Sequence, residues 1–244
     1  MPRFFVSSEM LQGSHVVLEG EQAAHAKVLR LSRGDEVTLC DGEGTDALCR
    51  VEELAAGQLH LEICSTAPSR SEPNLRCSIY MGFPKADKFE HVIQKATELG
   101  AYELVVFPCS RSVSRPDAKS ITKKLERWQK IAASAAEQSG RGRIPRVLAL
   151  DSFDAAIQRA SSAEFSALFY ENERTRSLRA AVETRGFTTA ALMTGPEGGL
   201  TEQEVEKAQA AGMEVCSLGP RILRCETAPL CALSALLYAA DELG

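Results

Sequence analysis

Hydrophobic and polar residues alternate in short segments over the first seventy residues of the chain. This alternation predicts β-strands at 16–18, 36–40, 46–51 and 58–64. Glycine-containing turn sequences separate the segments, and a helix is predicted over 21–31. Short strands at such regular spacing are typical of a small β-barrel, which we expect at the start of the chain.

The pattern changes after a polar, proline-rich stretch at 66–74, which we interpret as a linker. Strands and helices then alternate, as in an α/β domain built on a parallel sheet. The predicted strands are 75–83, 102–107, 146–150, 165–170, 188–193 and 213–218, and the main helices are 86–99, 118–139 and 226–242. We therefore predict two domains, 1–72 and 73–244.

The predicted C-terminal helix is apolar on every side between 228 and 240. A helix without a polar face must be buried, either in the core of its own domain or against a second subunit. No segment of the chain reaches the length of a membrane-spanning helix, and the apolar run at the start is too short for a secretion signal. We therefore expect a cytoplasmic protein that does not contact a membrane.

The eight cysteines and four histidines lack the close spacing that a zinc site requires. We expect no bound metal, and we expect most of the cysteines to be reduced and buried. The net charge of −5 conceals an uneven distribution. Residues 1–72 carry 6 Lys and Arg against 12 Asp and Glu, whereas 111–146 carry 10 against 3. That basic segment could contact phosphates, or it could be a solvated helix face.

Two loops carry the candidate chemistry. The first, 193–201, follows a buried strand and holds three glycines and a proline, so it predicts a tight turn with exposed backbone amides. Thr201 and Glu204 then form a capping box that starts the next helix. The loop matches neither a dinucleotide fingerprint nor a P-loop. By itself it could be a simple glycine-rich turn or a ligand site.

The second loop, 217–229, also leads from a strand into a helix, and it places Arg221, Arg224 and Glu226 beside the apolar Ile222 and Leu223. Charges next to the start of a buried helix are unfavourable unless they are paired or serve a ligand. One interpretation is a structural Arg224–Glu226 ion pair with Glu226 near the helix N-terminus. The other is a binding site.

Together the two loops resemble the signature of the SPOUT methyltransferases, and above all the 16S ribosomal RNA (uracil-N3)-methyltransferase family. The motifs are specific in their combination and order, and they span nearly the whole chain. They lie at 3–5, 27–31, 34–35, 85, 88, 95–100, 111–112, 137–145, 195–199 and 218–228. Cys225 departs from the pattern, because many relatives have Thr or Ala there.

The resemblance implies an α/β SPOUT-type domain with a C-terminal trefoil knot, preceded by a PUA-like β-barrel that docks RNA. It implies a homodimer with the last helix at the interface, in agreement with the apolar segment 228–240. The implied reaction transfers a methyl group from S-adenosylmethionine to ring N3 of uridine 1498 of 16S rRNA, in the assembled small ribosomal subunit.

The resemblance also assigns residues. The cofactor would contact Thr194, Gly195, Pro196, Glu197, Gly198, Gly199, Leu218, Gly219, Ile222, Leu223 and Arg224. Arg221 or Arg224 would stabilise charge on the uracil oxygens, and Glu226 would orient one of these arginines or take the proton. RNA would contact Arg3, Arg30, Lys88, Arg111, Arg141 and Arg143. Arg141 and Arg143 are flanked by glycine, which favours phosphate contacts over those of the helical lysines.

Two other functions are compatible with these residues. One is a knotted methyltransferase that acts on a ribose 2′-hydroxyl or on transfer RNA. The other is a non-catalytic RNA-binding or assembly factor that has kept the fold. The second would need a damaged cofactor pocket, and the sequences at 193–200 and 217–228 show no such damage.

Overall fold

The computed structural model describes residues 1–113, 117–183 and 186–243. The chain folds into two compact units. The first unit contains Met1–Glu72 together with Ala136–Ile144, and the second contains Pro73–Ala135 and Pro145–Gly244. The stretch at 136–144 therefore clusters with the N-terminal residues, although a division at 72/73 assigns it to the other domain. Arg115, part of the basic segment, lies outside the described residues.

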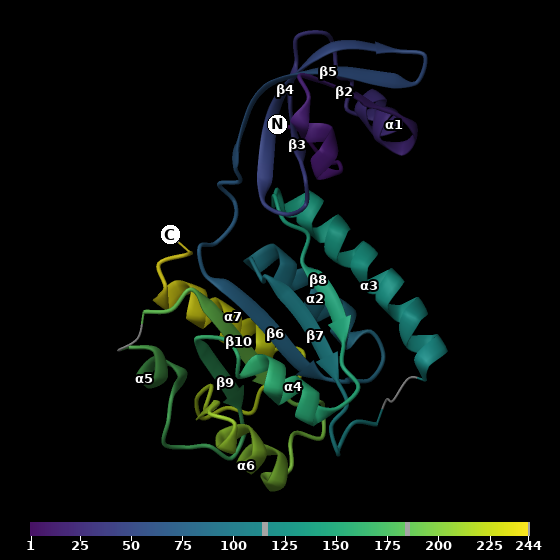
Figure 1. The fold of residues 1–244 in the computed structure, drawn as a ribbon. Coiled ribbons are helices and arrows are strands. Elements are labelled where there is room, and N and C mark those ends of the chain that lie inside the picture. The colour runs from purple at the N-terminus through teal and green to yellow at the C-terminus, as the bar shows by residue number, and fades with distance from the viewer. Residues whose placement is uncertain (114–116, 184–185, 244) are drawn as a thin grey trace. The chain divides into compact units, whose positions relative to one another are not determined.

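The first unit is a five-stranded sheet with the order β1-β3-β4-β5-β2 (Figure 1). Its strands are β1 (Arg3–Phe5), β2 (His15–Leu18), β3 (Glu36–Cys40), β4 (Thr45–Ala55) and β5 (Gln58–Pro68), with a short 3₁₀ helix η1 (Ser8–Gln12) and the helix α1 (Gly20–Val28). β5 pairs with β4 as far as Pro68. The linker predicted at 66–74 is therefore wrong over its first three residues, because they form part of this hairpin.

The sheet bends around a single core. Phe4 on one edge strand and Leu18 on the other belong to the same buried cluster as Leu39 and Leu61 in the centre. Register shifts in the β4–β5 pair, next to Leu48 and Val51, increase the local bend. The described backbone pairing ends at β1 and β2, so the barrel predicted for this region is an open, curled sheet by its hydrogen bonds.

Two ion pairs help to hold the first unit together. Arg141 has only 3% of its side chain exposed, and its Nη2 lies 2.6 Å from Oε2 of Glu72. The same carboxylate accepts a hydrogen bond from the backbone of Gly142. A Cβ at Gly142 would come within 2.4 Å of Ser69, so this contact requires glycine. A second pair joins Arg3 to Asp46 through two hydrogen bonds of 2.7 and 3.0 Å.

The second unit is a six-stranded parallel sheet with the order β11-β9-β10-β6-β7-β8. Its strands are β6 (Arg76–Gly82), β7 (Glu103–Phe107), β8 (Arg146–Ala149), β9 (Phe165–Phe169), β10 (Thr189–Thr194) and β11 (Glu214–Cys216). Its helices are α2 (Lys88–Leu99), α3 (Ala118–Ser139), α4 (Phe153–Ala160), α5 (Leu178–Val182), α6 (Glu202–Ala210) and α7 (Ala228–Ala239); the last residues of α3 cluster with the first unit.

Helices cover both faces of this parallel sheet, as the near-continuous apolar strands require. α4 and α6 pack with the sheet in one buried cluster, and α7 contacts α2, β6 and β10 (Figure 1). α2 ends where Gly100 takes a left-handed conformation with φ of 104°. α4 is not among the helices predicted from the sequence. Its N-cap is Ser152, whose side chain accepts a hydrogen bond from the amide of Ala155.

α7 is buried on one side only. Leu233, Leu236 and Leu237 have no exposed surface, whereas Cys231 and Tyr238 are exposed. The helix begins later than predicted, at Ala228, and ends at Ala239. An apolar helix is therefore present, with one face in the core of the second unit. Its other face lies open to solvent in the isolated chain, and no described helix is long and apolar enough to cross a membrane.

Replacing Arg141 with Met should destabilise the first unit by about 3 kcal/mol, because the Glu72 carboxylate would stay buried without its partner. Arg33 is exposed in the same unit, so Arg33→Met should change the free energy of unfolding by less than about 0.5 kcal/mol. Urea denaturation followed by circular dichroism measures both. Equal unfolding midpoints for the two variants would contradict a structural role for the Arg141–Glu72 pair.

Candidate functional site

A cleft of about 590 Å³ opens in the second unit where β9, β10 and β11 end. Open parallel sheets bind ligands at the carboxyl ends of their strands, and this volume is in the usual range for a small-molecule site. The lining residues come from the last residues of β9 and β10, from the segments that follow the three strands, and from the starts of α2 and α7. They are Lys88, Phe169, Tyr170, Glu171, Thr194, Gly195, Pro196, Glu197, Gly198, Gly199, Ser217, Leu218, Gly219, Arg221, Ile222, Leu223, Arg224, Cys225 and Ala228.

The loop at 195–199 is a tight turn that leaves little room for side chains. The Gly199 amide donates a 2.9 Å hydrogen bond to the Pro196 carbonyl, and Gly199 has a positive φ of 67°. A Cβ at Gly199 would come within 2.3 Å of Oε1 of Glu171, so the Glu171 carboxylate lies directly against this backbone. The loop then enters α6 through the predicted capping box, in which Thr201 and Glu204 bond each other's backbone amides.

Arg111 supports this loop from the end of β7. Its Nη1 donates hydrogen bonds of 3.0 and 3.2 Å to the carbonyls of Gly198 and Leu200. In the same segment, the amide of Ser110 donates a 2.7 Å bond to Oε1 of the buried Glu204. The segment after β7 therefore holds both the turn and the start of α6 in place.

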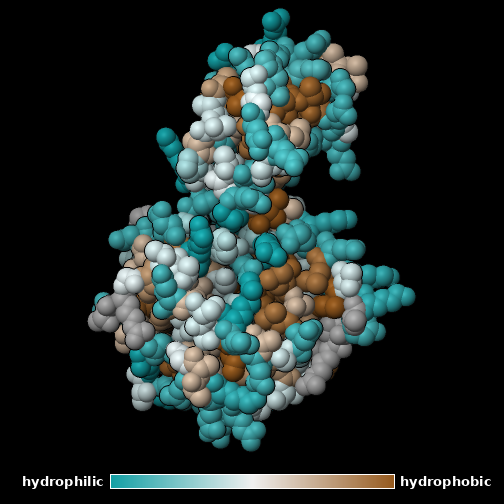
Figure 2. Space-filling model, in the orientation of Figure 1, coloured by the Kyte–Doolittle hydropathy of each residue, from teal (hydrophilic) through white to brown (hydrophobic). Residues whose placement is uncertain are grey.

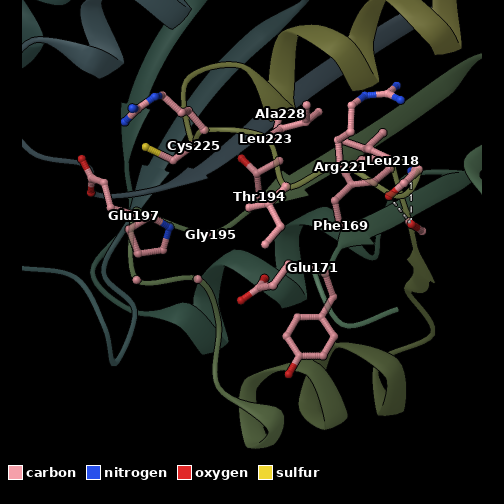
Figure 3. A pocket seen from close by; sticks show the side chains of 18 of the residues that line it. Phe169, Glu171, Thr194, Gly195, Glu197, Leu218, Arg221, Leu223, Cys225 and Ala228 are labelled. Carbon is pink, nitrogen blue, oxygen red and sulfur yellow. Dashed lines mark hydrogen bonds between the residues drawn. The ribbon is translucent and has the colours of Figure 1, made fainter. Parts of the chain in front are cut away.

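The segment from 217 to 228 forms the opposite wall. Hydrogen bonds between Ser217 and Gly219 fold it into a turn. Ile222 is 80% exposed, which is unusual for a large apolar side chain and leaves it available to a ligand. Among the described residues, neither Arg221 nor Arg224 has a carboxylate partner. Figure 3 shows Glu197 and Cys225 on one side of the cleft and Phe169 and Leu218 on the other.

Lys88 joins the two walls. Its Nζ lies 3.2 Å from Oε1 of Glu197 in the first loop and 3.1 Å from Oε2 of Glu226 in the second segment. It also lies 3.6 Å from Sγ of Cys225. The three charged side chains are 22–29% exposed. One ammonium group thus pairs with two carboxylates from separate parts of the chain.

The charges in this cluster shift each other's ionisation. The hydrogen bond to Glu226, followed by the one to Glu197, raises the pKa of Lys88. Burial alone would raise the pKa of Glu197 and of Glu226, but hydrogen bonds from backbone amides and from Lys88 outweigh it, so both values are lowered. Burial, and then the hydrogen bond to Glu226, raises the pKa of the Cys225 thiol to about 12. At neutral pH the cluster is one cation and two anions beside a neutral thiol.

The structure brings the two predicted loops together. Every residue predicted to contact the cofactor lines the cleft, and so does Arg221. Glu226 is not a lining residue, and it pairs with Lys88 rather than with Arg224. Glu171 and its neighbours at the end of β9 were not predicted. The rule that places ligands at the carboxyl ends of parallel strands would have identified them.

The residues predicted to contact RNA have mostly other partners. Arg3 and Arg141 form ion pairs with Asp46 and Glu72. Lys88 and Arg111 hold the walls of the cleft, as described above. Arg143 donates a hydrogen bond to the carbonyl of Glu43, while Arg30 is exposed. The guanidinium of Arg141 is buried against the Glu72 carboxylate, so this burial speaks against the phosphate contact, which stays a prediction.

Six of the eight cysteines are buried and all eight are free thiols. In the described part of the chain, no group of three or more His, Cys, Asp or Glu side chains is arranged to hold a metal ion.

A parallel α/β unit with a ligand cleft, preceded by a small curled β unit, defines the class of fold. A family model described as an RNA methyltransferase domain matches residues 71–237, and one described as an RNA methyltransferase PUA domain matches 18–64. The chain belongs to this family of RNA methyltransferases.

The chain is similar to relatives and solved structures over its whole length. It is 36% identical to the Bacillus subtilis ribosomal RNA small subunit methyltransferase E, with 100% of this chain and 98% of the relative covered. A crystal structure of a ribosomal RNA small subunit methyltransferase E from Neisseria gonorrhoeae, bound to S-adenosyl methionine, is 32% identical. It has a TM-score of 0.85 and covers 98% of each chain. A methyltransferase from Legionella pneumophila in complex with the same cofactor is 28% identical, with a TM-score of 0.81 and 97% of each chain covered.

Replacing Lys88 with Met should destabilise the second unit at pH 7, because Glu197 and Glu226 would face each other without a cation. Since both carboxylates have lowered pKa values, their stabilising contribution is present above about pH 4.5 and is lost as the pH falls through their folded values. The difference in unfolding free energy between wild type and variant should therefore narrow on acidification. Urea unfolding between pH 3 and 7 measures it.

Lys207→Met provides the control, because Lys207 pairs with Asp154 on an exposed surface. Exposed pairs contribute at most about 1 kcal/mol, so this variant should show a smaller loss at pH 7. A Lys88→Met effect that grew as the pH fell would contradict the role of Lys88 as the partner of two ionised carboxylates.

Proposed function

We propose that this protein transfers the methyl group of S-adenosylmethionine to N3 of a uridine in 16S rRNA, namely uridine 1498, in the assembled small ribosomal subunit. The observation that carries the proposal is the single cleft built by the 195–199 turn and the 217–228 segment. The names of full-length relatives and the cofactor in similar structures support the cofactor and the rRNA substrate.

The residues present suit this cofactor. The glycine turns provide backbone groups that a ligand can approach closely, and a Cβ at Gly219 would meet no atom within 4 Å. Leu218, Ile222 and Leu223 provide apolar surface for an adenine ring. Glu171 provides a carboxylate at the mouth of the turn that can accept hydrogen bonds from hydroxyl or amino groups. When bound, S-adenosylmethionine supplies a methyl carbon that is activated by its sulfonium.

The protein then has to place the uracil nitrogen in line with that carbon, and positioning of this kind can lower a barrier by several kcal/mol. Loss of the N3 proton leaves negative charge on the ring oxygens. Arg221 and Arg224 are exposed cations at the cleft without carboxylate partners among the described residues, so they can stabilise this charge.

The structure favours a structural role for Glu226 over that of proton acceptor. Its carboxylate is already paired with Lys88, and its pKa is lowered. A weaker base accepts a proton less readily at neutral pH. Of the two roles that the sequence left open, the orienting one therefore fits better, although the group that Glu226 orients is Lys88 and not one of the arginines.

We also propose a homodimer with α7 at the interface. Its exposed side carries apolar residues, and Tyr238 is 74% exposed. A contiguous apolar face on a structured helix is typical of a subunit interface. The N-terminal unit would dock the RNA, with 1–72 and 73–244 as the two functional domains.

The trefoil knot is a further part of the proposal. After β11, at one edge of the sheet, the chain passes through the cleft segment. It then forms α7, one face of which packs against α2 and against the central strands β10 and β6. This return path from the edge strand to the centre supports threading of the C-terminal segment through a loop.

Replacing Arg224 with Ala should lower methyl transfer by about 10²–10³-fold, because it removes a cation that stabilises the developing charge. S-adenosylmethionine should still bind, because ten of the eleven predicted cofactor contacts, the glycine turn among them, are unchanged. The substrate is small subunits from cells that lack this methylation, with the product nucleoside identified by mass spectrometry and cofactor binding measured by calorimetry. Wild-type protein should form N3-methyluridine at one site. A 2′-O-methyl product, or wild-type turnover by the variant, would contradict the assignment, and wild-type protein that binds no cofactor would indicate a non-catalytic factor.

Replacing Tyr238 with Glu should shift the protein towards a monomer, because a charge would then lie in an apolar interface. Analytical ultracentrifugation over a concentration series measures the change. Glu183 is exposed outside α7, so Glu183→Gln should leave the association unchanged. If wild type sediments as a monomer at high concentration, the proposed dimer is wrong.

A further inference from the structure

A surface that contacts RNA phosphates requires cations that are not already bound to other groups of the protein. Four of the six cations predicted for this role are held elsewhere: Arg3 and Arg141 in ion pairs of the first unit, and Lys88 and Arg111 in the cleft. The sequence nevertheless concentrates 10 Lys and Arg against 3 Asp and Glu in residues 111–146. Much of this charge lies on α3.

The exposed side of α3 forms a stripe of positive charge. At 100° per residue, its four cations fall within an arc of about 80°, and they extend for about 16 Å along the helix. They are Lys119, Lys123, Arg127 and Lys130, which we call the α3 basic stripe, and all four are exposed. Glu126 is the one acidic residue between 119 and 134. Lys123, Arg127 and Lys130 also line a shallow groove of about 420 Å³, in which Glu126 is the one acidic lining residue.

The opposite side of α3 explains why the stripe faces outward. Trp128 is buried and packs edge-to-face against Phe89 of α2, with ring centroids 4.9 Å apart. Lys124 lies over the Trp128 ring and is therefore engaged at the margin of the stripe. Arg127 pairs with Glu90, whereas Lys119, Lys123 and Lys130 have no carboxylate partner among the described residues. Figure 2 shows hydrophilic side chains along the margin of the view where Figure 1 places α3.

α3 also begins near the edge of the sheet that carries the cleft. All six strands are parallel, so β7 ends at the same edge as β10. Arg111, which follows β7, bonds directly to the turn of the cleft, and α3 starts seven residues later at Ala118. A strand of RNA that follows the stripe towards Lys119 would therefore run towards the edge where the methyl donor is proposed to bind.

We propose that the α3 basic stripe binds the phosphate backbone of the rRNA substrate and guides the target nucleotide towards the cleft. This inference rests on the proposed function, since that function makes RNA the substrate. Charge points to RNA as the ligand of this stripe. Several unpaired ammonium groups in a row, within an acidic chain, complement the charge of a polyanion. Phosphate contacts of this kind determine the position of the RNA and do not read its sequence.

The test compares two double variants that remove the same charge. Lys123→Gln/Lys130→Gln removes two unpaired cations of the stripe, and glutamine keeps nearly the same helix propensity as lysine. Arg179→Gln/Lys207→Gln removes two exposed cations from α5 and α6, where each has a carboxylate partner. Both proteins are titrated with small ribosomal subunits from cells lacking the methylation, over a range of salt concentrations.

The stripe variant should bind at least about tenfold more weakly at low salt, and the slope of log K against log salt should fall by about one for each lysine removed. The control variant should match wild type, and both variants should bind S-adenosylmethionine as wild type does. Equal affinity and slope for the stripe variant and the control would overturn the proposal. Weaker binding with an unchanged slope would also overturn it, because the lysines would then not contact phosphates.

The proposed function and this inference can fail separately. If wild type methylates the subunits but the stripe variant binds them as tightly as wild type, only the α3 proposal is wrong. If wild type neither binds the cofactor nor modifies the subunits, the proposed function itself is wrong.

Discussion

The cleft depends on one ammonium group that lies between two carboxylates. Lys88 contacts Glu197 in the turn after β10 and Glu226 just before α7. Neither segment belongs to the sheet, so strand pairing cannot hold them against each other. Without the cation, the carboxylates would repel each other and remain partly desolvated. The resemblance implies that Lys88 contacts RNA. In the structure its ammonium group instead links the two walls of the cleft.

Other cations of the chain also link segments that are far apart in the sequence. Arg111 uses its guanidinium to bind two carbonyls of the turn, and Arg141 spans from the 136–144 stretch to Glu72. A guanidinium suits such positions because it offers several donors in a rigid plane. These two arginines stabilise the protein by donating hydrogen bonds to carbonyl and carboxylate oxygens of other segments. They are therefore poor candidates for contacts with a mobile polyanion, whereas the exposed lysines of α3 have no competing partner among the described residues.

Within the cleft, the paired and unpaired charges have separate roles. Lys88 pairs with both Glu197 and Glu226, and together they connect the two walls of the cleft. Arg221 and Arg224 have no carboxylate partner among the described residues, and under the proposed function they stabilise the negative charge that develops on the uracil ring. A reactive site requires this division, because a cation that is already paired stabilises new negative charge less effectively. The elevated pKa of Cys225 keeps its thiol neutral, so it adds no further anion beside Glu226.

The sequence by itself determined the parallel α/β unit, the two loops and their membership of one site. Buried strands appear as continuous apolar runs, and turns that need glycine or proline appear directly in the residue order, as at Gly195 and Gly199. The sequence did not predict α4 and β1, because these elements are too short for a periodic pattern. It also predicted a linker over 66–68, where pairing with β4 overrides the proline-rich composition. Only the tertiary structure decided which charges meet, because Lys88 and Glu226 are 138 positions apart and an ion pair leaves no periodic trace in a sequence. It also assigned 136–144 to the first unit and separated the buried Arg141 from the exposed lysines of α3.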